Sequence, residues 1–228
     1  MRLYQHLTQC RFLYRVNRFI ARCEINGDDV SVHVKNTGRL SELLQPGAVA
    51  YVEQSDSPSR KTAYDLVAVE NRGYVVNIDS QAPNRIVREW LEQGGWGVEL
   101  EELRSEYTCG DSRYDFTYLR RGIRGLIEVK GVTLFDDNGM AFFPDAPTER
   151  GVKHLHGLIQ AAQKGMECGV CFVLQREGVM GLKPNDLTHP AFGDALRAAA
   201  AAGVRIEAAV CHVTPDSASI THTVPVFL

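Results

Sequence analysis

The pattern of apolar residues changes near residue 80, and this change divides the chain into two parts. Before it, short apolar runs follow one another between turn signals such as the Asn-Gly pair at 26–27. Strands spaced so closely, with only a short helical segment over 38–44, predict a small closed or partly closed β-barrel. The length suits a five-stranded barrel of the OB type. The polar segment 55–62 is expected to be an exposed loop between strands.

The second part alternates helices and strands. Four apolar residues between 86 and 91 recur at helical spacing, and two glycines close that segment. After it we expect strands over 98–107, 113–119, 125–134, 170–174, 204–213 and 219–225, and helices over 147–165 and 190–202. This alternation predicts an α/β domain of residues 81–228, which follows a barrel domain of residues 1–80.

Composition narrows the classes of protein. The chain has 228 residues, 44% of them hydrophobic, and a formal net charge of −3. Bulk attraction to nucleic acid is therefore excluded, and any such contact must come from a local patch. No apolar run approaches the roughly 18 to 20 residues of a membrane span, and no signal peptide is evident, so we expect a cytoplasmic protein without a membrane partner.

The six cysteines are too few and too irregularly spaced for a disulfide framework. Cys168 and Cys171 form a CxxC motif, but no second pair accompanies it. A structural zinc site normally needs four ligands. We therefore predict that both are buried cysteines of a strand.

The stretch GLIEVKGVTLF, residues 125–135, combines an apolar strand pattern with two charges. Side chains alternate across a strand, so Glu128 and Lys130 share one face and Val129 lies on the other. Asp115 precedes Glu128 by thirteen residues on the preceding strand. If the intervening turn makes the two strands neighbours, the two carboxylates can face each other at about 5 Å between Cβ atoms.

Two carboxylates so close are costly unless a cation neutralises them. A hard divalent cation, Mg²⁺ or Mn²⁺, that is bound by these carboxylates, waters and a substrate phosphate meets that requirement. Lys130 could then orient a water or stabilise charge on a phosphate. The alternative is an exposed sheet face with an ordinary Glu-Lys pair, and spacing alone leaves both interpretations open.

Further candidates flank this strand pair. Arg150, Lys153 and His154 stand at i, i+3 and i+4 near the start of a predicted helix, where cations and free amides could hold a phosphate backbone; a solvated helix face is the alternative. Arg113, two residues before Asp115, is a further candidate contact to nucleic acid. Glu89 could reach the same metal, or it could only pair with Arg85 four residues earlier.

Six stretches resemble one known family. They are RFIARCEI at 18–25, KNTGRLSELLQPG at 35–47, NIDSQAPNRIV at 77–87, SRYDF at 112–116, IEVKGVTL at 127–134 and FPDAPTERGVKHL at 143–155. The sequence is similar along nearly its whole length to the sugar fermentation stimulation protein A family. The last two stretches are long enough to be specific.

The resemblance implies an N-terminal OB-fold and a C-terminal domain similar to restriction endonucleases of the PD-(D/E)XK type. Asp115, Glu128 and Lys130 match the acidic and lysine positions of that motif, whereas Tyr114 replaces its proline. The family is described as binding DNA non-specifically and has been suggested to regulate maltose metabolism. Barrels of this type bind single strands with cations and stacked aromatics. Candidates for that surface are Lys35, Arg39, Tyr51, Arg60 and Lys61.

Two functions from different classes follow. The first is a metal-dependent nuclease that hydrolyses phosphodiester bonds in DNA or RNA, with contacts mainly to phosphates. The second is a nucleic-acid-binding regulatory protein that keeps the nuclease scaffold without turnover. A structural or protein-interaction module would leave the charged strand face unexplained. The sequence leaves the oligomeric state open, a homodimer included.

Overall fold

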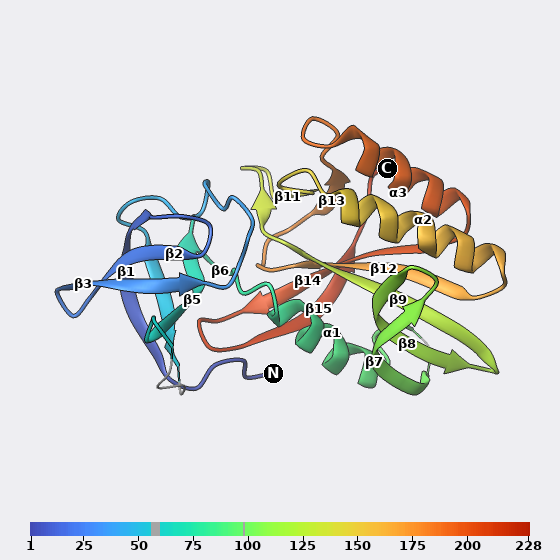
Figure 1. Ribbon diagram of the computed structural model, residues 1–228, viewed down its shortest axis with the longest axis horizontal. Coiled ribbons are helices and arrows are strands. Elements are labelled where there is room, and N and C mark those ends of the chain that lie inside the picture. The colour runs from blue at the N-terminus through green and yellow to red at the C-terminus, as the bar shows by residue number, and fades with distance from the viewer. Residues whose placement is uncertain (56–59, 98) are drawn as a thin grey trace.

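The computed structural model describes residues 1–55, 60–97 and 99–228. Parts of the predicted loop 55–62 and of the predicted strand 98–107 therefore lie outside the described residues. Figure 1 shows a barrel on the left, joined to an α/β domain on the right. The predicted fold class, an OB-type barrel followed by a restriction-endonuclease-like mixed-sheet domain, is confirmed.

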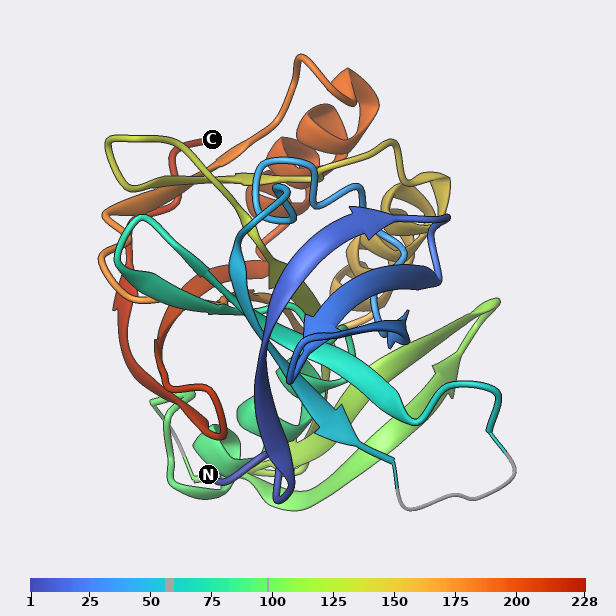
Figure 2. The ribbon, with the colours of Figure 1, turned by 90° about the vertical axis from the view of Figure 1, so that its left-hand side faces the viewer.

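The barrel closes because its third and fifth strands pair. Its strands lie in the order β3-β2-β1-β4-β5, and a parallel pairing of β3 with β5 completes the circuit (Figure 2). Alternate side chains, among them Phe12, Val32 and Val52, fill the interior. The strands are β1 Leu7–Arg15, β2 Ile20–Ile25, β3 Asp28–Val34, β4 Val49–Gln54, β5 Tyr64–Asn71 and an added β6 Tyr74–Asn77.

The short helix predicted over 38–44 is wrong. The segment forms a single turn, in which the N–H groups of Leu43 and Leu44 both donate to the carbonyl of Leu40. Leu40, Leu43 and Leu44 are all buried in the barrel core. Their apolar spacing therefore reflects a turn that caps the barrel and not a helix.

The second domain is a six-stranded mixed sheet with helices on both faces. The strand order is β15-β14-β12-β9-β8-β7, with parallel pairing only around β12. Helix α1 covers one face, and helices α2 and α3 cover the other (Figure 1). The elements are α1 Ala82–Glu92, β7 Glu101–Cys109, β8 Ser112–Arg120, β9 Ile123–Val132, α2 Glu149–Gln163, β12 Glu167–Leu174, α3 Pro190–Ala201, β14 Arg205–Val213 and β15 Ala218–Val224.

Local sequence explains where the helices begin. The Thr148 side chain accepts a hydrogen bond from the Gly151 N–H at 3.1 Å, which caps α2. Proline stands in the first turn of α1 and of α3, where its missing N–H costs nothing. None of the helices among the described residues is both long enough and apolar enough to cross a bilayer.

Two features of the second domain were not predicted. A small sheet of β10 Leu134–Phe135, β11 Met140–Phe143 and β13 Gly181–Pro184 lies beside the main one, and its strands are too short to carry a periodic signal. The first residues of the chain pack mainly on this domain: Leu3 and Tyr4 are buried with α1, and the Leu3 N–H bonds the carbonyl of Asp216.

Cys168 and Cys171 are buried in β12, as predicted. They point to opposite faces of the sheet, Cys168 toward α2 and α3 and Cys171 toward α1. Two thiols on opposite faces of a strand cannot share one metal ion. The CxxC spacing is therefore a consequence of two packed layers.

Helix α2 approaches the sheet closely because Gly157 has no side chain. A Cβ at this position would lie 2.1 Å from the Tyr114 hydroxyl, which is buried and donates to the His154 carbonyl at 3.3 Å. The close approach sets the depth at which the helix lies over β8. It thereby positions His154 relative to the strands.

We predict that Gly157→Ala lowers the free energy of unfolding by about 1 to 3 kcal/mol, because the methyl group overpacks this contact. Adding Tyr114→Phe should recover at least about 1 kcal/mol, since the next ring atom would be 3.5 Å away and alanine favours a helix. Urea denaturation of both variants and of Tyr114→Phe alone measures this cycle. A single Gly157→Ala variant as stable as wild type contradicts the packing argument.

Candidate functional site

Strands β8 and β9 separate where the predicted carboxylates lie. They pair from Arg120 and Ile123 as far as Phe116 and Ile127, and the ladder ends there. Asp115 stands at the next position, and its Oδ2 accepts a hydrogen bond from the Val129 N–H at 2.7 Å. The side chain of Asp115 thus takes the place of a backbone partner, and this holds its carboxylate between the two strands.

Asn84, in the first turn of α1, holds the other oxygen of Asp115. Its Nδ2 donates to Oδ1 at 2.8 Å. Both oxygens therefore have a donor, but a carboxylate oxygen can accept more than one hydrogen bond or ligand. Asp115 is oriented by groups from two different elements and keeps free lone pairs.

Glu128 lies under α2 with only 3% of its surface exposed. Its Oε1 contacts both the Lys130 Nζ and the His154 Nδ1 at 2.5 Å. Its Oε2 has no hydrogen-bond partner among the described residues. The alternative of an ordinary exposed Glu-Lys pair is therefore wrong, because the helix covers this face of the strand.

His154 connects Arg150 to Glu128. The Arg150 Nε donates to the His154 Nε2 at 3.3 Å. A guanidinium can only donate, so Nε2 is the acceptor nitrogen and the proton of a neutral ring sits on Nδ1, facing Glu128. The expectation that His154 contacts phosphate is corrected: the ring is 5% exposed and positions the carboxylate instead.

The two carboxyl groups have opposite pKa shifts. Burial, and then the charge of Glu128, raise the pKa of Asp115, while Val129, Asn84 and Lys130 partly offset this. Burial also acts to raise the pKa of Glu128, but the hydrogen bond from His154 and the charge of Lys130 outweigh it and lower the pKa. A cation bound beside the two carboxylates would relieve the repulsion that raises the pKa of Asp115.

The residues present fit a hard divalent cation that keeps other ligands. An unpartnered buried oxygen on Glu128 and free lone pairs on Asp115 are the oxygen donors that Mg²⁺ and Ca²⁺ prefer. No cluster of three or more His, Cys, Asp or Glu that could hold a metal occurs within residues 1–55, 60–97 and 99–228. Waters and a substrate phosphate would have to complete the coordination.

Glu89 does not reach this site. Its Oε2 forms an ion pair with the N-terminal ammonium of Met1 at 3.1 Å, so both the metal role and the alternative pairing with Arg85 are corrected. The Arg85 Nη1 instead donates to the Leu3 carbonyl. The reason is the unpredicted position of the chain start, which packs against α1.

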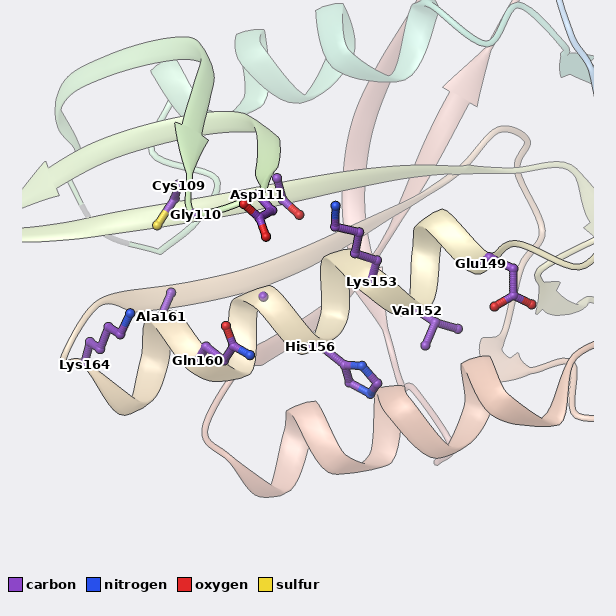
Figure 3. A pocket seen from close by; sticks show the side chains of 12 residues that line it. Cys109, Gly110, Asp111, Glu149, Val152, Lys153, His156, Gln160, Ala161 and Lys164 are labelled. Carbon is purple, nitrogen blue, oxygen red and sulfur yellow. The ribbon is translucent and has the colours of Figure 1, made fainter.

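Lys153 and Arg113 lie outside the buried cluster and remain accessible. Lys153 lines a groove of about 400 Å³ between α2 and the turn that joins β7 to β8. Figure 3 shows its side chain extending from the helix toward Asp111 in that turn, with Lys164 at the end of the same groove. Arg113 is mostly exposed and lies 3.6 Å from Glu106 on β7. Of the three predicted cations on this helix face, His154 is buried, Arg150 is exposed and Lys153 lies in the groove.

Several cations predicted on the barrel are already paired. The Lys35 Nζ lies 3.1 Å from Asp65 and 3.7 Å from Asp79. Although burial acts to raise it, hydrogen bonds from Arg60, His33 and Lys35 hold the pKa of Asp65 well below its usual value. The expectation that Lys35 and Arg60 contact nucleic acid is therefore corrected: both stabilise a buried carboxylate.

Two other barrel candidates have different surroundings. The Tyr51 hydroxyl donates to Glu70 at 2.5 Å. Arg39 is exposed, and its backbone N–H donates to Asp145 of the second domain at 3.3 Å. Arg39 therefore stays available as a contact.

Sequence reasoning missed two polar groups beside the strands. Asn84 orients Asp115, and nothing in its local sequence distinguishes it from an ordinary residue in the first turn of a helix. The buried Gln175 places its amide nitrogen 3.2 Å from where a Cβ on Gly131 would lie, and its Oε1 has no partner among the described residues. Gln175 comes directly after a buried strand, and that position was the only available signal.

Fold and site together define a two-domain protein in which an OB barrel precedes a restriction-endonuclease-like domain with a buried charged strand face. Two family profiles match: "SfsA N-terminal OB domain" over residues 13–78 and "Sugar fermentation stimulation protein RE domain" over residues 81–217. The chain belongs to the sugar fermentation stimulation protein family.

Relatives are similar along the whole chain. A sugar fermentation stimulation protein homolog of Desulfitobacterium hafniense is 49% identical over 215 residues, 94% of this chain and 93% of the relative. A homolog of Clostridium beijerinckii is 43% identical over 225 residues, 99% of each. The structure of Pyrococcus furiosus SfsA in complex with Ca²⁺ aligns with a TM-score of 0.90 and 27% identity over 100% of both chains.

We predict that Glu128→Gln lowers the free energy of unfolding by about 3 kcal/mol at about pH 7, because it leaves the ammonium of Lys130 beside a neutral group. The folded-state pKa of Glu128 lies below its ordinary value of 4.5, so its charge stabilises the fold above that value. The contribution is lost as the pH falls through the lower, folded pKa. The gap between variant and wild type should therefore shrink as the pH drops below 4.5.

Urea denaturation at several pH values measures this gap. The matched control is Glu24→Gln, which removes a carboxylate from an exposed pair with Arg11 and should cost under about 1 kcal/mol. A loss equal to that of the control, or a gap that does not shrink at all as the pH falls below 4.5, would show that Glu128 is not stabilised as an anion.

Proposed function

We propose that the protein is a metal-dependent nuclease that hydrolyses phosphodiester bonds in DNA or RNA. The observation that carries the proposal is the state of Glu128: one oxygen is held by Lys130 and His154, the other is buried without a partner among the described residues, and the charge of Glu128 acts on Asp115. A buried carboxylate oxygen without a partner is costly to the fold. Such a cost is typical of a functional site.

Asp115 and Glu128 would hold the cation, and Mg²⁺ or Mn²⁺ is the expected ion. When bound, the ion neutralises the phosphate and lowers the pKa of a bound water. Hydrolysis joins the water oxygen to phosphorus, breaks the bond from phosphorus to the sugar oxygen, and passes the water's proton to that oxygen. The two carboxylates need little rearrangement, because Asn84, Val129 and His154 already fix their positions.

Lys130 supplies positive charge next to the reacting phosphate. Its ammonium has three donors, of which one points at Glu128, so the others can face a phosphate oxygen or the attacking water. The Lys130 side chain is 16% exposed, which makes it reachable from solvent. Arg150 acts indirectly. It donates a hydrogen bond to His154, and His154 in turn orients Glu128.

The Pyrococcus furiosus relative in complex with Ca²⁺ supports a cation in this family fold. Ca²⁺, Mg²⁺ and Mn²⁺ all favour oxygen ligands, so one pair of carboxylates suits each of them. A cytoplasmic location, which would give access to nucleic acid, fits the six free cysteines.

A nucleic-acid-binding regulatory protein without turnover is the second candidate. One observation favours it: within the described residues, no group of three or more His, Cys, Asp or Glu is arranged so that it could hold a metal ion. Such a site would hold a cation only weakly without substrate. The charged groups would then act in binding alone, with a role in sugar metabolism as the family description suggests.

We predict that purified protein cleaves labelled DNA or RNA, single- or double-stranded, with Mg²⁺ or Mn²⁺ but not with EDTA. Asp115→Asn, Glu128→Gln and Lys130→Ala should each reduce the rate about 100-fold or more, because each removes a group that faces the developing charge. Arg11→Ala is the control and should leave the rate unchanged. Salt-sensitive binding that Lys130→Ala preserves, without any cleavage, would favour the regulatory protein.

A variant of Lys153 tests whether the phosphate backbone of a nucleic acid passes through the groove. Lys153→Ala should weaken binding about equally for unrelated sequences and reduce the slope of log affinity against log salt by about one. Fluorescence anisotropy in EDTA measures this. The control is Lys183→Ala, at an exposed lysine on β13 outside the groove; the same slope for both variants and wild type would exclude the groove.

A further inference from the structure

One end of the barrel carries exposed aromatic side chains on a rigid backbone. Tyr14 and Phe19 flank the turn between β1 and β2 and are 54% and 48% exposed. The turn is well ordered by Asn17, whose side chain accepts from the N–H groups of Phe19 and Ile20 at 2.8 and 3.0 Å. Exposed aromatics on an ordered turn cost the fold more than polar residues would, and such groups commonly mark a binding surface.

Arg15 fixes this turn to a second loop. All five of its N–H donors bind carbonyls: those of Asn17 and Arg18 in the turn, and those of residues 36, 38 and 39 in the loop after β3, at 2.6 to 3.1 Å. A guanidinium has five donors, so none is left for a ligand. We call the turn 16–19 and the loop 36–39 together the Arg15 platform.

The two arginines on the platform differ from the others of the barrel. Arg18 and Arg39 are exposed and form no ion pair with any described residue; the Arg18 guanidinium lies 5.5 Å from the centre of the Phe19 ring. The other arginines before residue 80, apart from Arg15, each pair with a carboxylate: Arg2, Arg11, Arg22, Arg60 and Arg72. Arg18 thus places an unpaired charge beside the exposed Phe19, and Arg39 lies in the loop that Arg15 ties to the same turn.

The platform is joined to the catalytic domain. Asp145 accepts from the Arg39 N–H at 3.3 Å, and a Cβ on Gly38 would lie 2.4 Å from the same carboxylate oxygen. Asp145 precedes Arg150 by five residues, so their Cα atoms are at most about 18 Å apart. A strand held on the platform is therefore near the helix that positions Glu128.

We propose that the Arg15 platform binds unpaired nucleotides of a single-stranded nucleic acid, with a base stacked on Phe19 and phosphates against Arg18 and Arg39. The inference rests on the proposed action on nucleic acid and adds the strandedness of the substrate. Stacking needs an open base face, which a duplex hides and a single strand offers. The free guanidinium groups match phosphates in charge and geometry.

The test is fluorescence anisotropy with a labelled 20-nucleotide deoxythymidine strand and a blunt duplex of equal length, in EDTA so that no cleavage occurs. Phe19→Ala should weaken single-strand binding about tenfold and duplex binding less than about twofold, whereas Phe19→Trp should keep wild-type affinity. Arg18→Ala with Arg39→Ala should reduce the salt slope by about 1.4, since each phosphate contact to a single strand contributes about 0.7. Arg11→Ala with Arg72→Ala removes the same charge from paired positions and should leave the slope unchanged.

The outcomes separate this inference from the nuclease proposal. Wild-type affinity in the platform variants overturns the platform, even if the protein cleaves with Mg²⁺. Single-strand binding that depends on Phe19, in a protein that never cleaves, supports the platform and overturns the nuclease. A wild-type protein that binds no single strand, or platform variants that alter only self-association by size-exclusion chromatography, also overturns the platform.

Discussion

The second domain is organised around one buried carboxylate, Glu128. A negative charge under a helix is tolerated only with compensating charge or donors, and Lys130 and His154 supply both to a single oxygen. That requirement determines what must surround it: a helix close enough to present His154, and a strand that presents Lys130 on the same face. The second oxygen has no hydrogen-bond partner among the described residues, so it can still accept a ligand.

Helix α2 can approach the strands so closely because of packing contacts between residues that take no part in the proposed reaction. Gly157 admits the hydroxyl of Tyr114, the residue that directly precedes Asp115. The large ring is thus accommodated by a missing side chain on the helix. The contact between Gly157 and Tyr114 thus determines where helix α2 presents His154 to the strands.

The two domains are joined by polar and aromatic contacts and not by a flexible linker alone. The Tyr4 hydroxyl lies 3.3 Å from Asp79 and accepts from Asn77 at 2.8 Å, and the buried Arg176 lies between the rings of Tyr74 and Phe135 at 4.7 and 4.6 Å. Buried polar contacts of this kind are directional. The barrel is therefore held at a defined place against the second domain.

Local pattern alone predicted the barrel, the strands and helices of the main sheet, and the strand face that carries Glu128 and Lys130, because alternation and helical spacing are properties of neighbouring residues. It missed the short strands β10, β11 and β13 and gave a helix over 38–44 that is a turn. Only the tertiary structure decided which charges are free. Lys35, Glu89 and His154 read as cations or ligands in sequence, yet each is occupied by a partner at least 26 positions away. Pairing over such separations depends on how elements pack, and no local pattern records it.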